Sequence, residues 1–396
     1  MEEIEVLKKH KFIIFGDGHF NTLGMIRSLG EAGIRSDVVT VGHCQMVGSS
    51  KYIRNYFVAN SIEDGLEYVI STFSQEKEKS FLLTGNDKII AVIDRNYDRL
   101  IDKFYFFNVG KEGGINRLLS KKEQNLLAES CGFNVPVFEE VRIGDKPEKV
   151  PYPLITKAID STVENWKGQV FVCHNESELA EAYSQLKGDR ILLQQYIEKK
   201  NETGFNAFTV KGGEETYLPL QLTYYDTTET SFGNSIYFFE PKDQELCERI
   251  KKLMKKTHYS GVFSIDLLIG KDDIIYFLEI NFRNSAWSYP STCAGVNLPI
   301  LWAQSVLNEK LAVGNVKIKK LPYSAIVDSA ELSHVFHEGF SKIIKTIKRI
   351  CECNSRVIWN WKDQGPFWSI IRNCIKIAMF NIECQICDAH RKRRVS

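Results

Sequence analysis

The chain has 396 residues, of which 43% are apolar and 26% are charged, and its formal net charge is +1. This length favours two or three domains with real cores, and the composition is ordinary for a globular protein. The small net charge argues against a nucleic-acid partner, and the chain shows neither an apolar run that could span a membrane nor a signal peptide at its acidic start.

The first 115 residues alternate between strand and helix patterns. Lys11-Phe-Ile-Ile-Phe15 is an apolar run that leads into Gly16-Asp-Gly18, and a helical pattern and a second apolar run at 37–41 follow. A further strand at 81–83 runs into Thr84-Gly-Asn-Asp87 and another helix. This βαβ order predicts a small, doubly wound, Rossmann-like domain.

The turn at Gly16 also resembles a dinucleotide-binding turn, because it follows a strand and opens a helix. However, Asn21 stands where a third glycine is expected, and no acidic residue ends the second strand. We therefore favour a structural turn beside a ligand cleft, and keep a nicotinamide-dependent oxidoreductase as a less favoured alternative.

The middle of the chain mixes helices with many strands. Its predicted helices lie at 121–132, 176–187 and 242–257. Its predicted strands, apart from the final hairpin, lie at 154–157, 169–173, 190–197, 205–211, 216–224 and 235–239.

The stretch from Ser264 to Arg283 predicts a hairpin that carries three oxygen ligands. A turn within Gly270–Asp273 would pair Gly270 with Asp273, or Ile269 with Ile274. Either register places Asp266 opposite Phe277, on the same face as Glu279 and Asn281. Buried carboxylates without partners are costly, and a few hard oxygen ligands suit Mg²⁺ held together with phosphate oxygens.

Three lysines are candidates for phosphate contacts, since a lysine neutralises phosphate oxygens as a point charge. Lys121 opens a helix, Lys157 ends an apolar strand, and Lys167 lies in the polar loop 160–168, which is suited to covering phosphates. The alternatives are solvated surface lysines and an ordinary connection between strands.

A strand that leaves its sheet at Gln194, Gln195, Tyr196 and Ile197 offers free backbone groups to an adenine edge. Glu202, in the polar segment that follows, is the candidate for binding ribose hydroxyls; the alternative is a solvated linker.

The composition changes after about residue 320. A basic helix is predicted at 339–350, and Trp361-Lys-Asp-Gln-Gly-Pro-Phe367 follows. The spacing of Cys384, Cys387 and His390 resembles that of zinc ligands. However, the third ligand lies too close to the second in the chain, so we do not expect a zinc site. Ten scattered cysteines in a chain without a leader favour reduced thiols and a cytoplasmic location.

These motifs, in this order, resemble the ATP-grasp superfamily over most of the chain, in particular carboxylate–amine ligases similar to D-aspartate ligase and the carbamoyl-phosphate-synthase large subunit. The motifs that carry the resemblance are Arg27–Gly33, Ser120-Lys121, Gly132–Pro136, Tyr152–Lys157, Gln194–Ile197, Asp266, Glu279–Arg283 and Ala294–Pro299. The element Trp361–Phe367 is similar to one seen late in such proteins.

The resemblance implies an α/β and α+β fold. A Rossmann-like pre-ATP-grasp domain would span residues 1–115 and a C-terminal extension residues 320–396. Between them an ATP-grasp domain over 116–319 would divide into a phosphate-loop subdomain, 116–190, and a metal-binding subdomain, 191–319.

The resemblance also implies roles for the candidate residues. Lys121 and Lys157 would contact ATP phosphates, and Lys167 would lie in the phosphate-covering loop. Gln194 to Ile197 would hold adenine, Glu202 the ribose, and Asp266, Glu279 and Asn281 the metal. Arg283 would lie near the γ-phosphate and act with Lys157 in catalysis. The chain departs from the family pattern at Ser120, at Gln194-Gln195 and at Leu267 after Asp266.

The implied function is an ATP-dependent carboxylate–amine ligase that uses Mg²⁺, or Mn²⁺ in its place. It would form an amide through an acyl phosphate and release ADP and phosphate. Small-molecule carboxylates and amines would be its partners, and a homodimer is the commonest assembly. The alternative is an ATP-binding regulatory or assembly protein without turnover. Residues expected to face the substrate from loop positions are His19, Asn21, Asp87, Tyr225, Ser285, Trp287 and Ser288.

Overall fold

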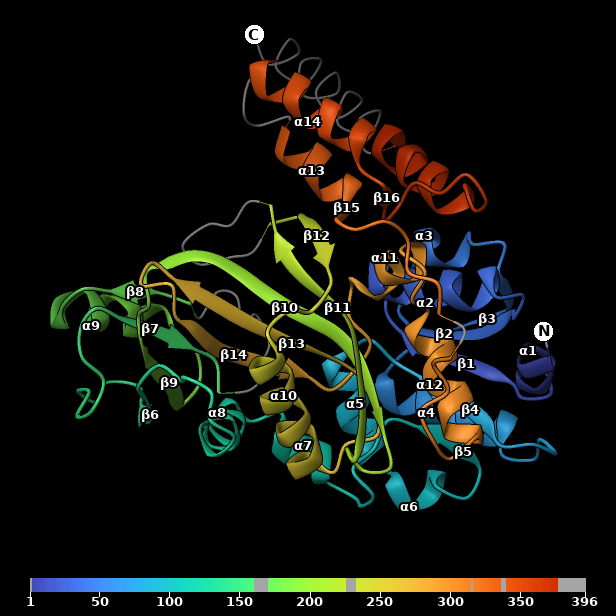
Figure 1. The fold of residues 1–396 in the computed structure, drawn as a ribbon, viewed down its shortest axis with the longest axis horizontal. Helices are drawn as coiled ribbons and strands as arrows, with labels where there is room; N and C mark the ends of the chain where they lie inside the picture. Colours follow the sequence, from blue (N-terminus) through green and yellow to red (C-terminus); the bar gives the residue numbers. More distant parts are fainter. Residues whose placement is uncertain (1, 160–169, 226–232, 315, 336–339, 377–396) are drawn as a thin grey trace, which may run out of the picture.

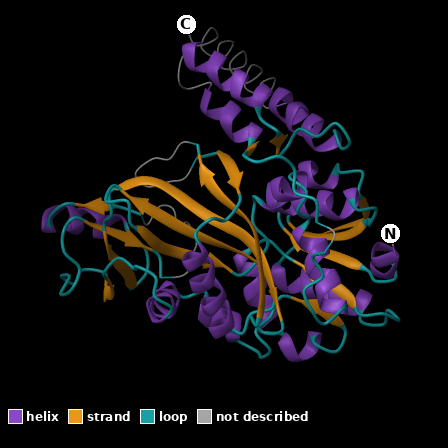
Figure 2. Ribbon diagram, viewed as in Figure 1, coloured by secondary structure: helices purple, strands orange, loops and turns teal. Residues whose placement is uncertain are grey.

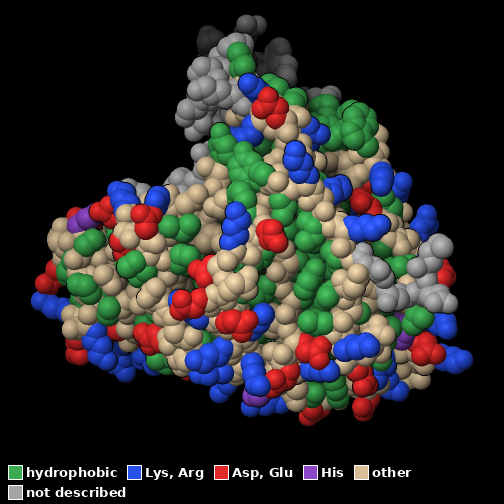
Figure 3. Space-filling view, in the orientation of Figure 1, with side chains coloured by type: hydrophobic (Ala, Val, Ile, Leu, Met, Phe, Trp, Pro, Cys, Tyr) green, Lys and Arg blue, Asp and Glu red, His purple; other side chains and the backbone are tan. Residues whose placement is uncertain are grey.

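The computed structural model describes residues 2–159, 170–225, 233–314, 316–335 and 340–376. In this part of the chain, three β-sheets are combined with helices that pack against them (Figures 1 and 2). The expected mixture of α/β and α+β structure is thus confirmed. No helix among these residues is both long enough and apolar enough to cross a bilayer. Figure 3 shows acidic and basic side chains interspersed over the face in view, without a broad field of one sign.

The N-terminal sheet is parallel, with the order β3-β2-β1-β4-β5. Its strands are β1 (Phe12–Gly16), β2 (Ser36–Val41), β3 (Ile53–Ala59), β4 (Ser80–Leu83) and β5 (Phe104–Phe106). Its helices are α1 (Glu2–Leu7), α2 (Phe20–Glu31), α3 (Gln45–Gly48), α4 (Ile62–Phe73), α5 (Asp87–Asp94), α6 (Tyr97–Leu100) and α7 (Gly114–Leu118). The strand order reverses between β1 and β4, so the segments that follow these strands meet at one edge, where ligands commonly bind.

A smaller, four-stranded sheet follows, with the order β6-β9-β7-β8. It comprises β6 (Phe138–Arg142), β7 (Leu154–Lys157), β8 (Val172–Cys173) and β9 (Arg190–Gln195), with α8 (Lys121–Ser130) before it and α9 (Glu176–Gln185) within it. A core cluster of its own, which includes Leu154, Cys173, Leu179 and Ile191, packs separately from the main core. The sheet therefore forms a unit that carries Lys157 at the end of β7.

The third sheet has seven strands, in the order β14-β13-β10-β11-β12-β15-β16. They are β10 (Lys199–Val210), β11 (Glu215–Tyr224), β12 (Ser235–Phe239), β13 (Gly261–Gly270), β14 (Ile275–Asn281), β15 (Tyr323–Ile326) and β16 (Ser355–Arg356). The helices of this part are α10 (Gln244–Thr257), α11 (Ser288–Cys293), α12 (Leu298–Leu307), α13 (Asp328–Val335) and α14 (Phe340–Glu352). The segment after residue 320 thus continues this sheet, while α13 and α14 project beyond it (Figure 1).

The β13–β14 hairpin corrects the expected register. Phe277 pairs with Leu267, and a bulge at Leu278 then places Glu279 directly opposite Asp266. The expected pairing of Asp266 with Phe277 is wrong for two reasons. The turn is one residue longer than expected, so that Ile269 pairs with Ile275 and not with Ile274, and the bulge then sets two residues of β14 against one of β13. The correction brings the two carboxylates closer than the expected register would, on the shared face.

The C-terminal segment is anchored to the N-terminal domain by a buried ion pair. Arg27 and Asp363 are 0% and 1% exposed, and Arg27 Nε lies 3.0 Å from Asp363 Oδ2. The guanidinium also donates to the carbonyl oxygens of Val357 and Ile358, at 2.7 and 2.9 Å. Ser50 Oγ donates to the same carboxylate at 2.8 Å. Two motifs 336 residues apart in the chain are therefore parts of one contact.

Candidate functional site

Three carboxylates lie along one face of the large sheet. In the ladder, Gly204 pairs with Asp266, and Asp266 pairs with Glu279. Because side chains alternate along a strand, Glu202 shares this face with Asp266. A Cβ on Gly204 would lie 2.4 Å from the carbonyl oxygen of Ile265 and 3.3 Å from Asp266 Oδ1. The absence of a side chain at residue 204 thus leaves room for the carboxylate group of Asp266.

The hairpin residues fit a divalent cation. Burial, and then the carboxylates of Glu279 and Glu202, raise the pKa of Asp266 well above its ordinary value of 3.8. Asn281 Nδ2 donates to Asp266 Oδ2 at 3.0 Å, and Asn281 Oδ1 accepts from Arg283 at 3.0 Å and keeps a second lone pair. A cation bound here would offset the repulsion between the carboxylates, which contributes to the raised pKa of Asp266.

The candidate ligand set is small. Within the described part of the chain, no three His, Cys, Asp or Glu side chains come together as a metal site. The predicted set instead combines two carboxylates, of Asp266 and Glu279, with the amide of Asn281. Such a set suits a hard cation that takes its remaining oxygen ligands from phosphate and water.

Two predicted lysines, at the start of α8 and at the end of β7, lie close to the carboxylate of Glu279. Lys121 Nζ lies 3.8 Å from Glu279 Oε2, across the boundary between α8 and β14. Burial, and then the charge of Lys121, lower the pKa of Lys157 to about 8, while the carboxylates of Glu279 and Glu202 oppose this shift. Lys121, Lys157, Glu202, Asp266 and Glu279, far apart in the sequence, therefore form one electrostatic cluster.

We expect nucleotide affinity to depend on the charge of Lys157. Its folded-state pKa lies below the ordinary 10.5, so the ammonium is charged below about pH 8 and becomes neutral above it. ADP affinity should therefore fall by about tenfold between about pH 7 and about pH 9.5, which corresponds to losing one charged contact with phosphate. Lys157→Arg should remain charged and lose much less affinity. Calorimetric titration with ADP checks this, and equal losses in both proteins would contradict it.

An unexpected residue on α8 positions Lys121. Gln124 Nε2 donates to the carbonyl oxygen of Ile280 at 3.0 Å, and Gln124 Oε1 accepts from the Ile280 backbone N–H at 2.8 Å. This buried reciprocal pair joins α8 to β14 beside Glu279. A glutamine on a helix carries no sequence signal for such a contact, so sequence reasoning missed it.

The predicted hinge lies where β9 ends. Gln194 is buried and pairs with Phe138 and Ile155, and the Tyr196 backbone N–H donates to the carbonyl oxygen of Pro153 at 3.0 Å. Ile197 lies beside Gly270, whose added Cβ would come within 3.2 Å of its side chain. The roles of Gln194, Gln195, Tyr196 and Ile197 toward adenine stay predictions.

Glu202, the predicted ribose ligand, forms a buried ion pair with Lys199. Their side chains are 9% and 6% exposed. A register shift in β10 between Lys199 and Asn201 brings two residues three apart onto one face. The polar segment Glu198-Lys-Lys-Asn-Glu202 gives no sign in the sequence that Lys199 is buried, so sequence reasoning missed this partner of Glu202.

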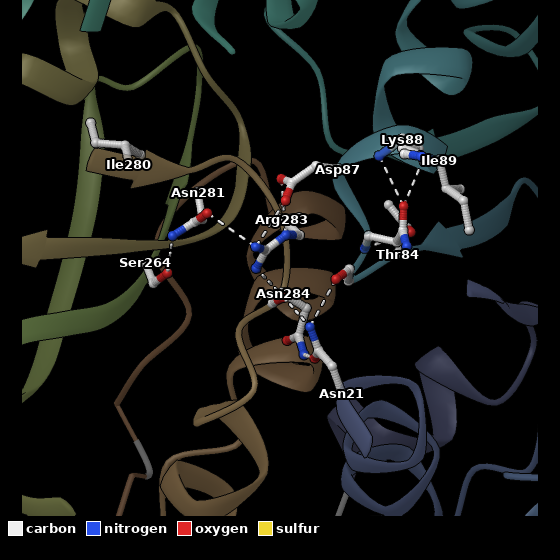
Figure 4. Close-up of polar contacts among 12 residues, drawn as sticks. Asn21, Thr84, Asp87, Lys88, Ile89, Ser264, Ile280, Asn281, Arg283 and Asn284 are labelled. Atoms are coloured by element: carbon white, nitrogen blue, oxygen red, sulfur yellow. Dashed lines mark hydrogen bonds and ion pairs between the residues drawn. The ribbon is translucent and has the colours of Figure 1, made fainter. Parts of the chain in front are cut away.

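Arg283 lies between the hairpin and the N-terminal domain (Figure 4). Its Nε and Nη2 donate to the two carboxylate oxygens of Asp87, each at 3.0 Å. Asp87 is the first residue of α5, directly after the segment that leaves β4. The structure thus joins two predicted residues, a catalytic one and a substrate-facing one, in a single bidentate pair.

The other substrate-facing candidates fall into a buried group and an exposed group. Asn21 Nδ2 donates to the carbonyl oxygens of Gly85 and Asn284, so its side chain links the segment after β4 to the segment after β14. Trp287, on the loop after Asn284, is buried, and its Nε1 donates to Tyr224 Oη at 3.1 Å. In contrast, the exposed ring of Tyr225 packs against Arg349.

The remaining candidates are placed as follows. Ser285 and Ser288 lie buried beside Trp287, and His19 is exposed at the start of α2, where its Nδ1 accepts from the Asn21 N–H. Lys167 and the loop 160–168 lie outside the described residues, as do Cys384, Cys387 and His390. The predictions for these positions stay predictions.

In sequence, parts of the chain are similar to N5-carboxyaminoimidazole ribonucleotide synthases. No protein-family model matches it. It is 27% identical over 133 residues to the N5-carboxyaminoimidazole ribonucleotide synthase of Staphylococcus epidermidis, which covers 34% of this chain and 35% of that protein. It is 26% identical over 231 residues to the Staphylococcus haemolyticus protein of the same name, which covers 54% of this chain and 58% of that protein. The chain thus matches less than two thirds of the length of these relatives.

Solved structures extend the likeness to most of the fold. The L-amino acid ligase of Bacillus licheniformis superimposes with a TM-score of 0.62 over 78% of both chains, at 15% identity. The Aspergillus clavatus carboxyaminoimidazole ribonucleotide synthase, complexed with ATP, superimposes with a TM-score of 0.59 over 79% of this chain and 80% of that one, at 14% identity. These neighbours are ATP-grasp ligases. We conclude that the chain has the fold of these ATP-grasp ligases.

Proposed function

We propose that this protein is an ADP-forming ligase that uses ATP to join a carboxylate to an amine. The observation that carries the proposal is the cluster in which Asp266 and Glu279, on the large sheet, face Lys121 and Lys157, from the smaller sheet and its preceding helix. Carboxylates for a cation beside lysines for phosphates form a set suited to phosphoryl transfer. Neighbours solved with ADP and ATP support nucleotide binding at this fold.

In the proposed first step, an oxygen of the substrate carboxylate attacks the γ-phosphorus of ATP. The bond from this phosphorus to the bridging oxygen breaks, and ADP leaves with the electron pair. Lys157 and Arg283 offset the charge that develops on the phosphoryl oxygens. A divalent cation held by Asp266, Glu279 and Asn281 would supply further neutralisation of phosphate charge.

In the proposed second step, the nitrogen of a neutral amine attacks the acyl carbon. The carbon–oxygen bond to phosphate breaks, phosphate leaves, and the nitrogen releases a proton to solvent. No side chain of the protein has to act as a nucleophile. Positioning and the electrostatic field of the cluster are therefore the main contributions of this chain.

The substrates that fit this proposal are small molecules. Two kinds of neighbour are named for their products or substrates, an L-amino acid ligase and carboxyaminoimidazole ribonucleotide synthases. We propose an amino acid or another small carboxylic acid as the acyl donor, and a small amine as the acceptor. They would bind beside Arg283 and the carboxylate face of the hairpin, where α5 of the N-terminal domain meets the segment 283–288.

The test is a screen of carboxylate and amine pairs with ATP and Mg²⁺. We expect stoichiometric ADP and phosphate with one class of pair, and an amide product of the corresponding mass. AMP and pyrophosphate would contradict the acyl-phosphate route. Tight ATP binding without ADP release across the whole panel would instead favour an ATP-binding protein without turnover.

We also propose that the protein works in a reducing compartment such as the cytoplasm. The cysteines of the described residues are all free thiols. Burial raises the pKa of Cys173 and of Cys293 to about 11, so these thiols are protonated and unreactive at neutral pH. Unpaired, scattered thiols are typical of a reducing environment.

A further inference from the structure

The N-terminal domain contacts the hairpin through a compact set of polar groups. The Asn284 backbone N–H donates to the carbonyl oxygen of Thr84 at 3.1 Å, and the side chains of Asn284 and Asn21 bond each other and nearby backbone. The Asp87–Arg283 pair lies beside them (Figure 4). Within this set, only the pair places opposite charges on the two sides of the boundary.

The guanidinium of Arg283 has almost all of its donors engaged. Of its five N–H groups, the one on Nε and one on Nη2 bind Asp87, the second on Nη2 binds Asn281 Oδ1, and one on Nη1 reaches the Asn284 carbonyl oxygen at 3.3 Å. Among the described residues, this leaves a single Nη1 hydrogen for an incoming oxygen. Asp87 and Asn281 thus fix the plane of the group from two directions.

Asp87 also holds Arg283 away from other acids. The carboxylates of Asp266 and Glu279 attract the same guanidinium. Without a partner in the N-terminal domain, the flexible arginine would turn toward these two groups and neutralise the face that is suited to a cation. A bidentate aspartate holds it in place, because two parallel bonds define both its position and its plane.

We propose that Asp87 is a positioning residue of the ligase, which fixes Arg283 so that its remaining Nη1 hydrogen is presented to the reacting phosphoryl and carboxyl oxygens. The proposal rests on the proposed function. It assigns to the N-terminal domain a part in the chemical step, beyond its contact with the hairpin. A group fixed in advance stabilises developing charge without having to reorganise during the reaction.

The experiment measures steady-state ADP release by Asp87→Asn with an active substrate pair. We expect kcat to fall by about 10²-fold, because an ångström-scale misplacement of a catalytic group has that effect, while KM for ATP changes by less than about threefold. Asp87→Glu, which keeps the charge, should recover part of the loss. In an Arg283→Ala background, Asp87→Asn should change kcat by less than about threefold, because the two residues act as one unit.

Two matched controls separate positioning from simple contact between domains. Thr292→Val removes the bond of Thr292 Oγ1 to Ser28 Oγ, at 2.9 Å, which joins α11 to α2, and its bond to the carbonyl oxygen of Ser288 within α11. Asp98→Asn changes an exposed acid on α6. Both should keep kcat within about twofold of wild type, since surface changes and single outlying bonds have small effects.

Three results would overturn the inference: unchanged kcat in Asp87→Asn, an equal loss in Thr292→Val, or an undiminished effect of Asp87→Asn in the Arg283→Ala background. Thermal unfolding of each variant checks that the protein is folded. If the wild type turns over no substrate pair, the proposed function fails and the positioning role fails with it. If the wild type turns over a substrate pair and Asp87→Asn has an unchanged kcat, only the positioning role is contradicted, and the proposed function stands.

Discussion

Replacing Asp266 by asparagine is expected to lower ADP release by about 10³-fold, because the change removes one of two opposed carboxylates from the cation face. Asparagine keeps the shape of the side chain and can still accept from Asn281 Nδ2, which donates to Asp266 at 3.0 Å. The loss should therefore reflect charge at the site and not misfolding. Steady-state ADP release with an active substrate pair is the measurement.

The same variant should be more stable than the wild type in the absence of metal. The folded-state pKa of Asp266 is raised above 3.8, so ionising this group is harder in the folded protein than in the unfolded chain. The resulting penalty grows as the pH rises past the ordinary carboxyl range and is complete above the raised pKa. Asparagine does not ionise, so its stability advantage in urea unfolding should be larger at about pH 8 than at about pH 5.

A matched control is available in the same hairpin. Asp272 is exposed in the turn, and Asp272→Asn should leave ADP release within about twofold of the wild type. Retained activity in Asp266→Asn would show that the carboxylate face is not the reaction site. A variant that is less stable than the wild type at the higher pH would contradict the electrostatic explanation.

Replacing Arg27 by methionine is expected to cost about 3–5 kcal/mol of unfolding free energy, because it leaves the buried carboxylate of Asp363 without its counter-charge. Both side chains are at most 1% exposed, so water cannot take over the role of the guanidinium. The C-terminal segment should detach first, since this pair holds it against α2. Urea unfolding of the variant, followed by circular dichroism, measures the change.

The double variant Arg27→Met, Asp363→Leu tests the cause of that loss. When both charges are replaced by apolar side chains, no unpaired charge remains, and much of the stability should return. The exposed pair of Lys8 and Glu5 provides the comparison, and Glu5→Gln should cost less than about 1 kcal/mol. A single variant as stable as the wild type, or a double variant as unstable as the single one, would contradict the assignment.

Local sequence patterns predicted the elements that carry the site. The strand at 154–157 and the strand at 235–239 appear with the expected bounds, and the helix that begins at Lys121 begins there in the structure. These patterns report apolar periodicity, capping residues and turn residues, which act over a few neighbours in the chain. The same periodicity correctly placed Asp266, Glu279 and Asn281 on one face.

Contacts between distant segments were decided only by the tertiary structure. The bulge at Leu278 sets Glu279 against Asp266, Asp87 binds Arg283 across 196 residues, and Arg27 binds Asp363 across 336. A register depends on how both strands pack, and a buried charge selects its partner from all groups that folding brings near. The sequence by itself therefore determined which residues line the faces of each element. Only the packed chain decided which of those faces meet, because a buried charge must find its partner among the groups that folding brings near.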